Sequence, residues 1–271
     1  MSAERPFAAT RRIAEGRSQD GALVRRVLPE EVPVALVHNG STLAVMMATP
    51  SDLEDFAWGF ALTEGVAPVD ELGTVEVVPH GSGIEARMWL PEARAEALHA
   101  RRRATVGPVG CGLCGIDSLE QATRALPIVE GGIALTFDDL EMALDALRGW
   151  QPLHDETRAV HGAGFYRPGE GIVLAREDVG RHNALDKLIG AMARAGLDPA
   201  SGAIVLTSRI SLELVQKAAM AGAPIICAVS SPTATALETA KTAGITLASR
   251  AGGALAVYTQ SHRLGGDPDV Q

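Results

Sequence analysis

Two of the three cysteines, Cys111 and Cys114, stand two residues apart in a glycine-rich stretch. Such a pair could bind zinc, exchange a disulfide or carry sulfur as a persulfide. A structural zinc site needs four ligands, and the sequence holds no second Cys-x-x-Cys and no His-x-x-x-His to complete one. The zinc deaminases pair His-x-Glu with a later Pro-Cys-x-x-Cys, and no His-x-Glu precedes the cysteines here. The sequence therefore predicts no metal site.

The residues around the pair favour a mobile loop over a fixed redox turn. Gly110, Gly112 and Gly115 flank the cysteines, and no aromatic residue lies within ten positions on either side. Because glycine opposes a single backbone conformation, we predict that residues 107–115 are mobile in the free protein. A mobile thiolate suits delivery of a group, and sulfur is the group that it carries most readily. Cys227 lies in an apolar run and is predicted to be a buried strand residue.

Three polar turns, at residues 176–183, 207–211 and 230–234, each follow an apolar strand and open a helix. In an open α/β sheet, ligands bind beyond the carboxyl ends of the strands. The turns supply hydroxyl and cationic side chains beside helix N-termini, namely Arg181, His182, Arg209, Ser211, Ser231 and Thr233. Helix N-termini with arginines form an anion site, and we expect phosphate there. The alternative is that Ser211 and Thr233 only cap their helices.

Two histidines accompany these turns. His161 and His182 could be general bases, metal ligands or structural groups. On a helix, His182 and Asp186 share a face and could form a His–carboxylate pair. No Walker motif or strand-linked Gly-x-Gly-x-x-Gly occurs, so the expected ligand is not a nucleoside triphosphate bound in the ordinary way.

The elements that position these residues form two groups. Residues 116–260 alternate between short apolar strands and helices, which predicts parallel pairing with helices on both faces of the sheet. Residues 22–115 read as a small mixed α+β domain that ends in the cysteine loop. The ends of the chain, residues 1–21 and 261–271, are predicted to be a flexible N-terminal arm and a flexible C-terminal tail.

The smaller domain has two clear local signals. Apolar runs on either side of Asn39-Gly40 predict a β-hairpin. Ser51 and Glu54 form a capping-box pattern, which predicts a helix that runs to Gly65.

Composition narrows the class of protein. The chain has 271 residues, 46% of them hydrophobic, and a formal net charge of -9. This charge disfavours general binding to nucleic acid or to an anionic membrane. No apolar run approaches the ~18 residues of a membrane span, and no apolar segment follows Arg11-Arg12 as in a twin-arginine signal. Three cysteines do not make up a framework of paired disulfides, which suits a reducing compartment, so we expect a cytoplasmic protein.

Five stretches of the sequence are informative together: "REDVGRHNALDKLIG", the Cys-Gly-x-Cys-Gly loop, "RISLELVQKAAMAG", "SPTATA" and "AVYT". They resemble the FdhD family of formate dehydrogenase accessory sulfurtransferases. The resemblance covers about residues 30–260 and implies a cytidine-deaminase-like, three-layer α/β/α C-terminal domain with a smaller mixed α+β N-terminal domain. It also implies a homodimer.

The resemblance further implies a reaction and its residues. A member of this family receives sulfur from a cysteine desulfurase and passes it to the molybdenum (or tungsten) bis-guanine dinucleotide cofactor, as formate dehydrogenase requires. Cys111 corresponds to the persulfide carrier and Cys114 to its partner. The family's cofactor-binding stretch falls on Ala248, Ser249, Arg250, Ala251, Gly252 and Gly253. The alternative is a chaperone that binds the cofactor while its cysteines only tether or protect it.

Overall fold

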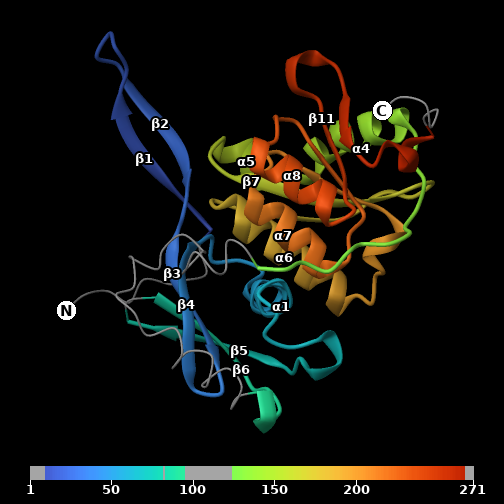
Figure 1. Ribbon diagram of the computed structural model, residues 1–271. Coiled ribbons are helices and arrows are strands. Elements are labelled where there is room, and N and C mark those ends of the chain that lie inside the picture. Colours follow the sequence, from blue (N-terminus) through green and yellow to red (C-terminus); the bar gives the residue numbers. More distant parts are fainter. Residues whose placement is uncertain (1–9, 82, 95–123, 266–271) are drawn as a thin grey trace.

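The computed structural model describes residues 10–81, 83–94 and 124–265. Cys111, Cys114 and the predicted mobile stretch at 107–115 lie outside the described residues. The described chain forms a two-stranded, a four-stranded and a six-stranded sheet, with helices packed on the two larger ones (Figure 1). No helix in the described ranges is long and apolar enough to cross a membrane.

The four-stranded sheet and helix α1 (Leu53–Thr63) form the N-terminal lobe. Its strand order is β4-β3-β6-β5, with bounds β3 (Val32–His38), β4 (Ser41–Ala48), β5 (Val75–His80) and β6 (Gly83–Met88). The short helix η1 (Val69–Glu71) precedes β5. The predicted hairpin between β3 and β4 is confirmed, and Asn39 and Gly40 have φ angles of 46° and 75°. These left-handed residues make the tight turn that joins strands with the usual right-handed twist.

The start of α1 differs from the prediction. The N-cap is Asp52, whose backbone is left-handed with φ 52°, and no side chain caps the helix. The Ser51–Glu54 capping box is therefore wrong. The preceding loop is held from the other lobe instead, because the Thr49 amide donates to Asp178 Oδ2 at 3.0 Å.

The six-stranded sheet has the order β12-β11-β10-β9-β7-β8. Parallel pairing is confirmed for β9, β10 and β11, whereas β7, β8 and β12 pair antiparallel to their neighbours. The strand bounds are β7 (His161–Arg167), β8 (Gly171–Asp178), β9 (Ala203–Leu206), β10 (Ile225–Ala228), β11 (Thr246–Ser249) and β12 (Ala256–Thr259).

Helices cover both faces of this sheet, as predicted. Ile204 and Leu206 pack in one core cluster with residues of α6, α7 and α8, while Ala203 and Val205 pack in another with α4. Alternate residues of a strand point to opposite faces, so the sheet lies between two helical layers. The bounds are α4 (Phe137–Leu147), η2 (Arg148–Trp150), α5 (Pro152–Thr157), α6 (Arg181–Arg194), η3 (Pro199–Ser201), α7 (Leu212–Ala221), α8 (Ala234–Thr242), η4 (Ala251–Gly253) and η5 (Ser261–Leu264).

The two lobes meet where α1 crosses α6. A Cβ atom on Gly59 would lie 1.7 Å from the carbonyl oxygen of Asp186, and one on Gly190 would lie 1.8 Å from that of Asp55. The two backbones therefore touch, and only glycine fits at the crossing. This contact fixes α6, whose first turn carries Arg181 and His182, relative to the N-terminal lobe.

The flexible arm predicted for residues 1–21 is wrong over its described strand. β1 (Arg11–Arg17) pairs antiparallel with β2 (Leu23–Pro29). Asp20 and Gly21 form part of the turn between them, and Gly21 has a φ of 82°.

The flexible tail predicted for residues 261–271 is also wrong at its start. η5 (Ser261–Leu264) packs on the fold, with Arg263 only 6% exposed and Leu264 only 2% exposed. The Arg263 guanidinium donates to three backbone carbonyls, those of Val129, Gly131 and Gly244, at 3.1, 2.7 and 2.7 Å. Buried carbonyls need donors, so this arginine holds the end of the chain in place.

Candidate functional site

The strand directions bring the three predicted polar turns to one edge of the six-stranded sheet. β8 runs in the same direction as β9, since both pair antiparallel with β7. The carboxyl ends of β8, β9, β10 and β11 therefore meet at the edge where β7 begins, and we call this the carboxyl edge. The residues predicted to bind cofactor lie at it or beside it, from His161 and Arg181 to Gly253.

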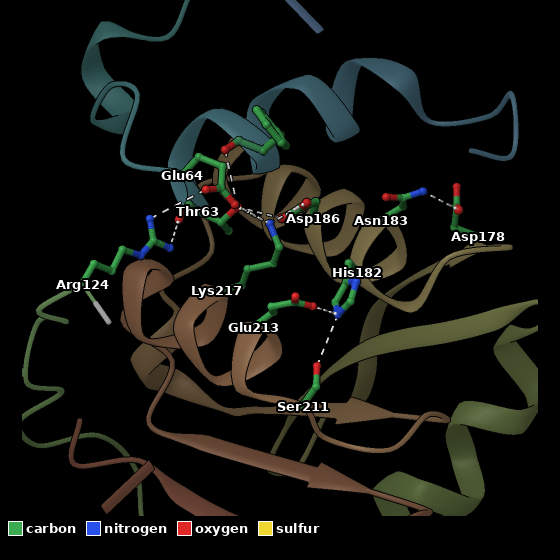
Figure 2. Close-up of polar contacts among 11 residues, drawn as sticks. Thr63, Glu64, Arg124, Asp178, His182, Asn183, Asp186, Ser211, Glu213 and Lys217 are labelled. Atoms are coloured by element: carbon green, nitrogen blue, oxygen red, sulfur yellow. Dashed lines mark hydrogen bonds and ion pairs between the residues drawn. The ribbon is translucent and has the colours of Figure 1, made fainter. Parts of the chain in front are cut away.

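The centre of the carboxyl edge is a contact between α6 and α7. His182 Nε2 lies 2.5 Å from Glu213 Oε2 and 3.3 Å from Ser211 Oγ (Figure 2). Both partners contact the same ring nitrogen, whereas a Ser–His–acid relay uses opposite nitrogens. The arrangement therefore lacks the geometry of that hydrolytic relay. The predicted partner Asp186 is wrong, because its carboxylate bonds to Thr63 and Lys217 instead.

The helix-cap alternative holds for Thr233 and not for Ser211. Thr233 is the N-cap of α8, and its hydroxyl accepts from the Ala236 amide at 3.2 Å. Ser211 occupies the N-cap position of α7, but its side chain makes no cap hydrogen bond. Its hydroxyl points toward His182, so no side-chain hydrogen bond from Ser211 occupies the backbone amides at the N-terminus of α7.

Arg209 and Ser231 lie on adjacent turns. Ile210 and Pro232 form a parallel bridge that extends the pairing of β9 and β10, and the Thr233 amide donates to the Ile210 carbonyl at 2.9 Å. Arg209 and Ser231 directly precede the bridged residues, and both are exposed. A guanidinium and a hydroxyl side by side at two helix N-termini can bind an anion.

His161, the first residue of β7, lies in a positively charged setting. Burial lowers the pKa of its imidazole, and the nearby charge of Arg181 lowers it further. Both effects favour the neutral ring at pH 7. His161 can therefore offer a neutral hydrogen-bonding group near the cationic Arg181.

The stretch from Ala248 to Gly253 is only partly accessible. Ala248 packs in the core cluster with α4, and the buried Ser249 hydroxyl lies 3.2 Å from Tyr258 OH. Arg250 turns to α4, with Nη1 2.6 Å from Asp145 and 3.0 Å from Glu141. Ligand contact in this stretch is therefore left to residues 251–253, where the exposed Gly252 and Gly253 have φ angles of 76° and 91°.

A buried carboxylate supports the start of α6. Asp178 has a fully buried side chain, and it accepts from Lys187 Nζ at 2.6 Å. It also accepts from the amides of Thr49 and Gly180 and from Asn183 Nδ2, at 3.0, 2.8 and 3.0 Å. These donors satisfy both oxygens and tie the turn before Arg181 to the N-terminal lobe.

A buried lysine that the sequence reasoning missed supports α7. Lys217 Nζ lies 2.9 Å from Asp186 and 3.0 Å from both Glu64 and Thr63 (Figure 2). Burial alone lowers the pKa of Lys217, but the two carboxylates outweigh it and hold the pKa above its ordinary value. Arg124 donates to the Thr63 carbonyl at 2.9 Å. The sequence signal for this network is a lysine within a largely apolar helical run.

Among the described residues, no group of three or more histidine, cysteine or acidic side chains could hold a metal ion. Cys227, in β10, is fully buried, and burial raises the pKa of its thiol to about 12. Its prediction as a buried strand residue is confirmed.

Comparison with known proteins identifies the family. The model of the FdhD/NarQ family matches residues 29–265. The chain belongs to this family. A sulfur carrier protein FdhD from Agrobacterium fabrum is 50% identical over 262 residues, which cover 95% of this chain and 97% of that protein. One from Brucella abortus is 53% identical over 224 residues, which cover 82% of this chain and 83% of that protein.

A solved structure supports the fold. The crystal structure of a candidate formate dehydrogenase accessory protein from Desulfotalea psychrophila superposes with a TM-score of 0.74. The alignment covers 94% of this chain and 98% of that one at 24% sequence identity. At this identity the likeness is one of fold.

Proposed function

We propose that this protein accepts sulfur from a cysteine desulfurase as a persulfide on Cys111 and passes it to the molybdenum cofactor. The acceptor is the bis-guanine dinucleotide form that formate dehydrogenase requires. The observation that carries the proposal is membership of a family whose relatives, aligned over almost the whole chain, are named sulfur carriers. The Cys-x-x-Cys pair supplies the thiol that such a role needs.

Loading moves one sulfur atom without a net change of redox state. The Cys111 thiolate attacks the outer sulfur of the donor's persulfide, a new S–S bond forms, and the donor cysteine leaves as a thiolate. Cys114 could attack Cys111 Sγ in that persulfide, which would close a disulfide and release hydrosulfide. We propose that Cys114 governs when the sulfur leaves.

The carboxyl edge is the proposed binding site for the cofactor, which is a substrate here. Its dinucleotide phosphates match the exposed Arg209, the uncapped N-terminus of α7 and the hydroxyl of Ser231. The backbone of Gly252 and Gly253 offers a second contact at the far end of the same edge. Guanine nucleotides alone should therefore bind this protein.

Three further properties follow from the family resemblance and stand as proposals. They are a cytidine-deaminase-like arrangement of the C-terminal part, a homodimer and a cytoplasmic location. The two helical layers around the six-stranded sheet support the first.

Intact-mass measurement tests the sulfur chemistry. The purified protein is incubated with a cysteine desulfurase and cysteine, and we expect an adduct of about 32 Da, one sulfur atom. The adduct should persist in Cys227→Ala and disappear in Cys111→Ala. If wild type gains no adduct but still binds guanine nucleotide, the cofactor-binding chaperone is the correct function.

A further inference from the structure

The β1–β2 hairpin projects from the fold beside the carboxyl edge. Its two strands form a sheet of their own, and Figure 1 shows the hairpin extending away from both lobes. At its base, Arg11 Nε lies 2.5 Å from Glu156 Oε2 of α5. The N-terminus of α5 lies at the carboxyl edge, because the amides of Leu153 and His154 donate to Glu177, near the end of β8, at 2.9 and 2.8 Å. The hairpin therefore stands next to the edge at which we place the cofactor.

The pairing register shows which side chains of the hairpin lie on the side of α5. Alternate residues of a strand point to the same face, and so do residues directly opposite each other. Ile13 and Arg17 therefore share the face of Arg11, and their register partners Val27 and Leu23 share it too. Ile13 is 70% exposed and Leu23 is 60% exposed. We call Ile13, Arg17, Leu23 and Val27 the α5-side face.

The hairpin is basic within an acidic chain. Residues 11–29 hold five arginines and two carboxylates, a formal net charge of +3, whereas the whole chain carries -9. Arg25 pairs with Glu15, but the Arg17 guanidinium donates to the backbone carbonyl of Gly21 at 2.9 Å. Arg17 makes no ion pair within the part of the chain that the structure describes, so its charge is open to a partner.

The chemistry of the α5-side face defines the surface that fits it. A hairpin of two strands is marginally stable in water, so a partner that covers its exposed apolar side chains stabilises it. Opposite charge on the partner favours the contact and speeds the encounter. The matching surface therefore combines apolar side chains with carboxylates.

We propose that the α5-side face binds the apo form of formate dehydrogenase, the enzyme that receives the cofactor. This inference rests on the proposed function, and the position of the hairpin selects the partner. The enzyme must take the cofactor from the carboxyl edge, and a protein held on the α5-side face lies beside that edge. The sulfur donor is under no such constraint, since it has to reach only Cys111.

The size of the face sets the strength of the contact. A stable interface buries roughly 800 Å² on each partner, which is more than one face of a short hairpin supplies. The complex should therefore be transient, as delivery requires. The face lies outside the matched family region, residues 29–265, so it is separate from the residues that carry the shared chemistry.

Binding of the full-length protein to apo formate dehydrogenase tests the proposal. Wild type should bind, and its Kd should rise with salt, because salt screens opposite charges. Ile13→Asp and Arg17→Glu should each raise the Kd at least about fivefold, as the loss of an interface anchor does.

The opposite face of the same hairpin supplies matched controls. Leu28 lies opposite Arg12 and Arg26 opposite Ala14, so Leu28 and Arg26 point away from the α5-side face. Leu28 is 42% exposed, and Arg26 is exposed. Leu28→Asp and Arg26→Glu repeat the two changes in side-chain type and should leave the Kd within about twofold of wild type, a difference far below the loss of an anchor.

Two further measurements separate this contact from the sulfur chemistry. All four variants should gain the persulfide adduct as wild type does and should bind guanine nucleotide with an unchanged Kd. A wild type that gains no adduct contradicts the proposed function and leaves the binding test intact.

Three results would overturn the proposal itself. The first is a wild type that does not bind the apo-enzyme, and the second is an equal loss of binding from changes on the two faces. The third is an Ile13→Asp protein that binds the apo-enzyme normally but is loaded with a raised KM by the cysteine desulfurase, because the hairpin would then serve the sulfur donor.

Discussion

Replacing Gly59 by alanine should separate the two lobes where α1 crosses α6. The new Cβ would lie 1.7 Å from the carbonyl oxygen and 2.5 Å from the carbonyl carbon of Asp186. Both atoms are helix backbone, so no side chain can rotate away, and one helix must shift by more than an ångström. Because a helix moves as a rigid body, the first turn of α6, which carries Arg181 and His182, shifts together with the crossing.

Overpacking a core typically costs about 1–3 kcal/mol, and a backbone clash belongs at the upper end. We expect a loss of about 3 kcal/mol in the free energy of unfolding, which lowers Tm by about 6–12 °C in a chain of this size. Calorimetry measures the Tm of Gly59→Ala and of a control variant, Gly149→Ala, whose Cβ would meet no atom within 4 Å. A Gly59→Ala protein as stable as this control would refute the close helix crossing.

Arg209→Ala should weaken guanine nucleotide binding by about 1–3 kcal/mol, since a charge-assisted hydrogen bond to phosphate is lost. Titration calorimetry compares the Kd of this variant with that of the control Arg167→Ala, which lies at the end of β7 away from the carboxyl edge. An unchanged Kd in Arg209→Ala would remove Arg209 from the site. The hydrogen bond from His182 holds the pKa of Glu213 below its ordinary 4.5. The stabilisation from Glu213 is therefore present above that pH and is lost as pH falls through the lowered value. Glu213→Gln should accordingly cost unfolding free energy at pH 7, and this cost should shrink as the pH falls below 4.5; a cost that stays constant as the pH falls would contradict this assignment. Arg263→Ala leaves three backbone carbonyls without their donor and should lower the free energy of unfolding, measured in urea, by about 3 kcal/mol. A loss of under about 1 kcal/mol would show that Arg263 does not hold the end of the chain in place.

The sequence correctly predicted those turns, strands and helices whose formation depends on residues close together in the chain. Asn39-Gly40 forms its hairpin turn because both residues accept left-handed backbone angles. The alternation of apolar strands and helices after residue 160 predicted the sheet, and with it the carboxyl edge. Asp20-Gly21 is the same kind of signal for the β1–β2 turn, but the arginines on both strands hide the apolar pattern.

The missed contacts all depend on residues distant in sequence. The spacing of His182 and Asp186 describes one helix, whereas Lys217 of α7 and Thr63 of α1 bind Asp186 in the fold. Asp178 similarly holds the loop before α1, which replaces the Ser51 capping box. No local pattern can show that Asp186 is buried, because its partners come from α1 and α7.

The most direct test of the central claim follows sulfur from the cysteine to the enzyme that needs it. Each of the three cysteines is changed to alanine, and persulfide labelling is combined with a formate dehydrogenase assay in cells that lack the native protein. We predict that Cys111→Ala abolishes both loading and activity, that Cys114→Ala loads sulfur but transfers it poorly, and that Cys227→Ala retains both. If Cys111→Ala loads sulfur and restores formate dehydrogenase as well as wild type does, Cys111 is not the carrier and the account is wrong.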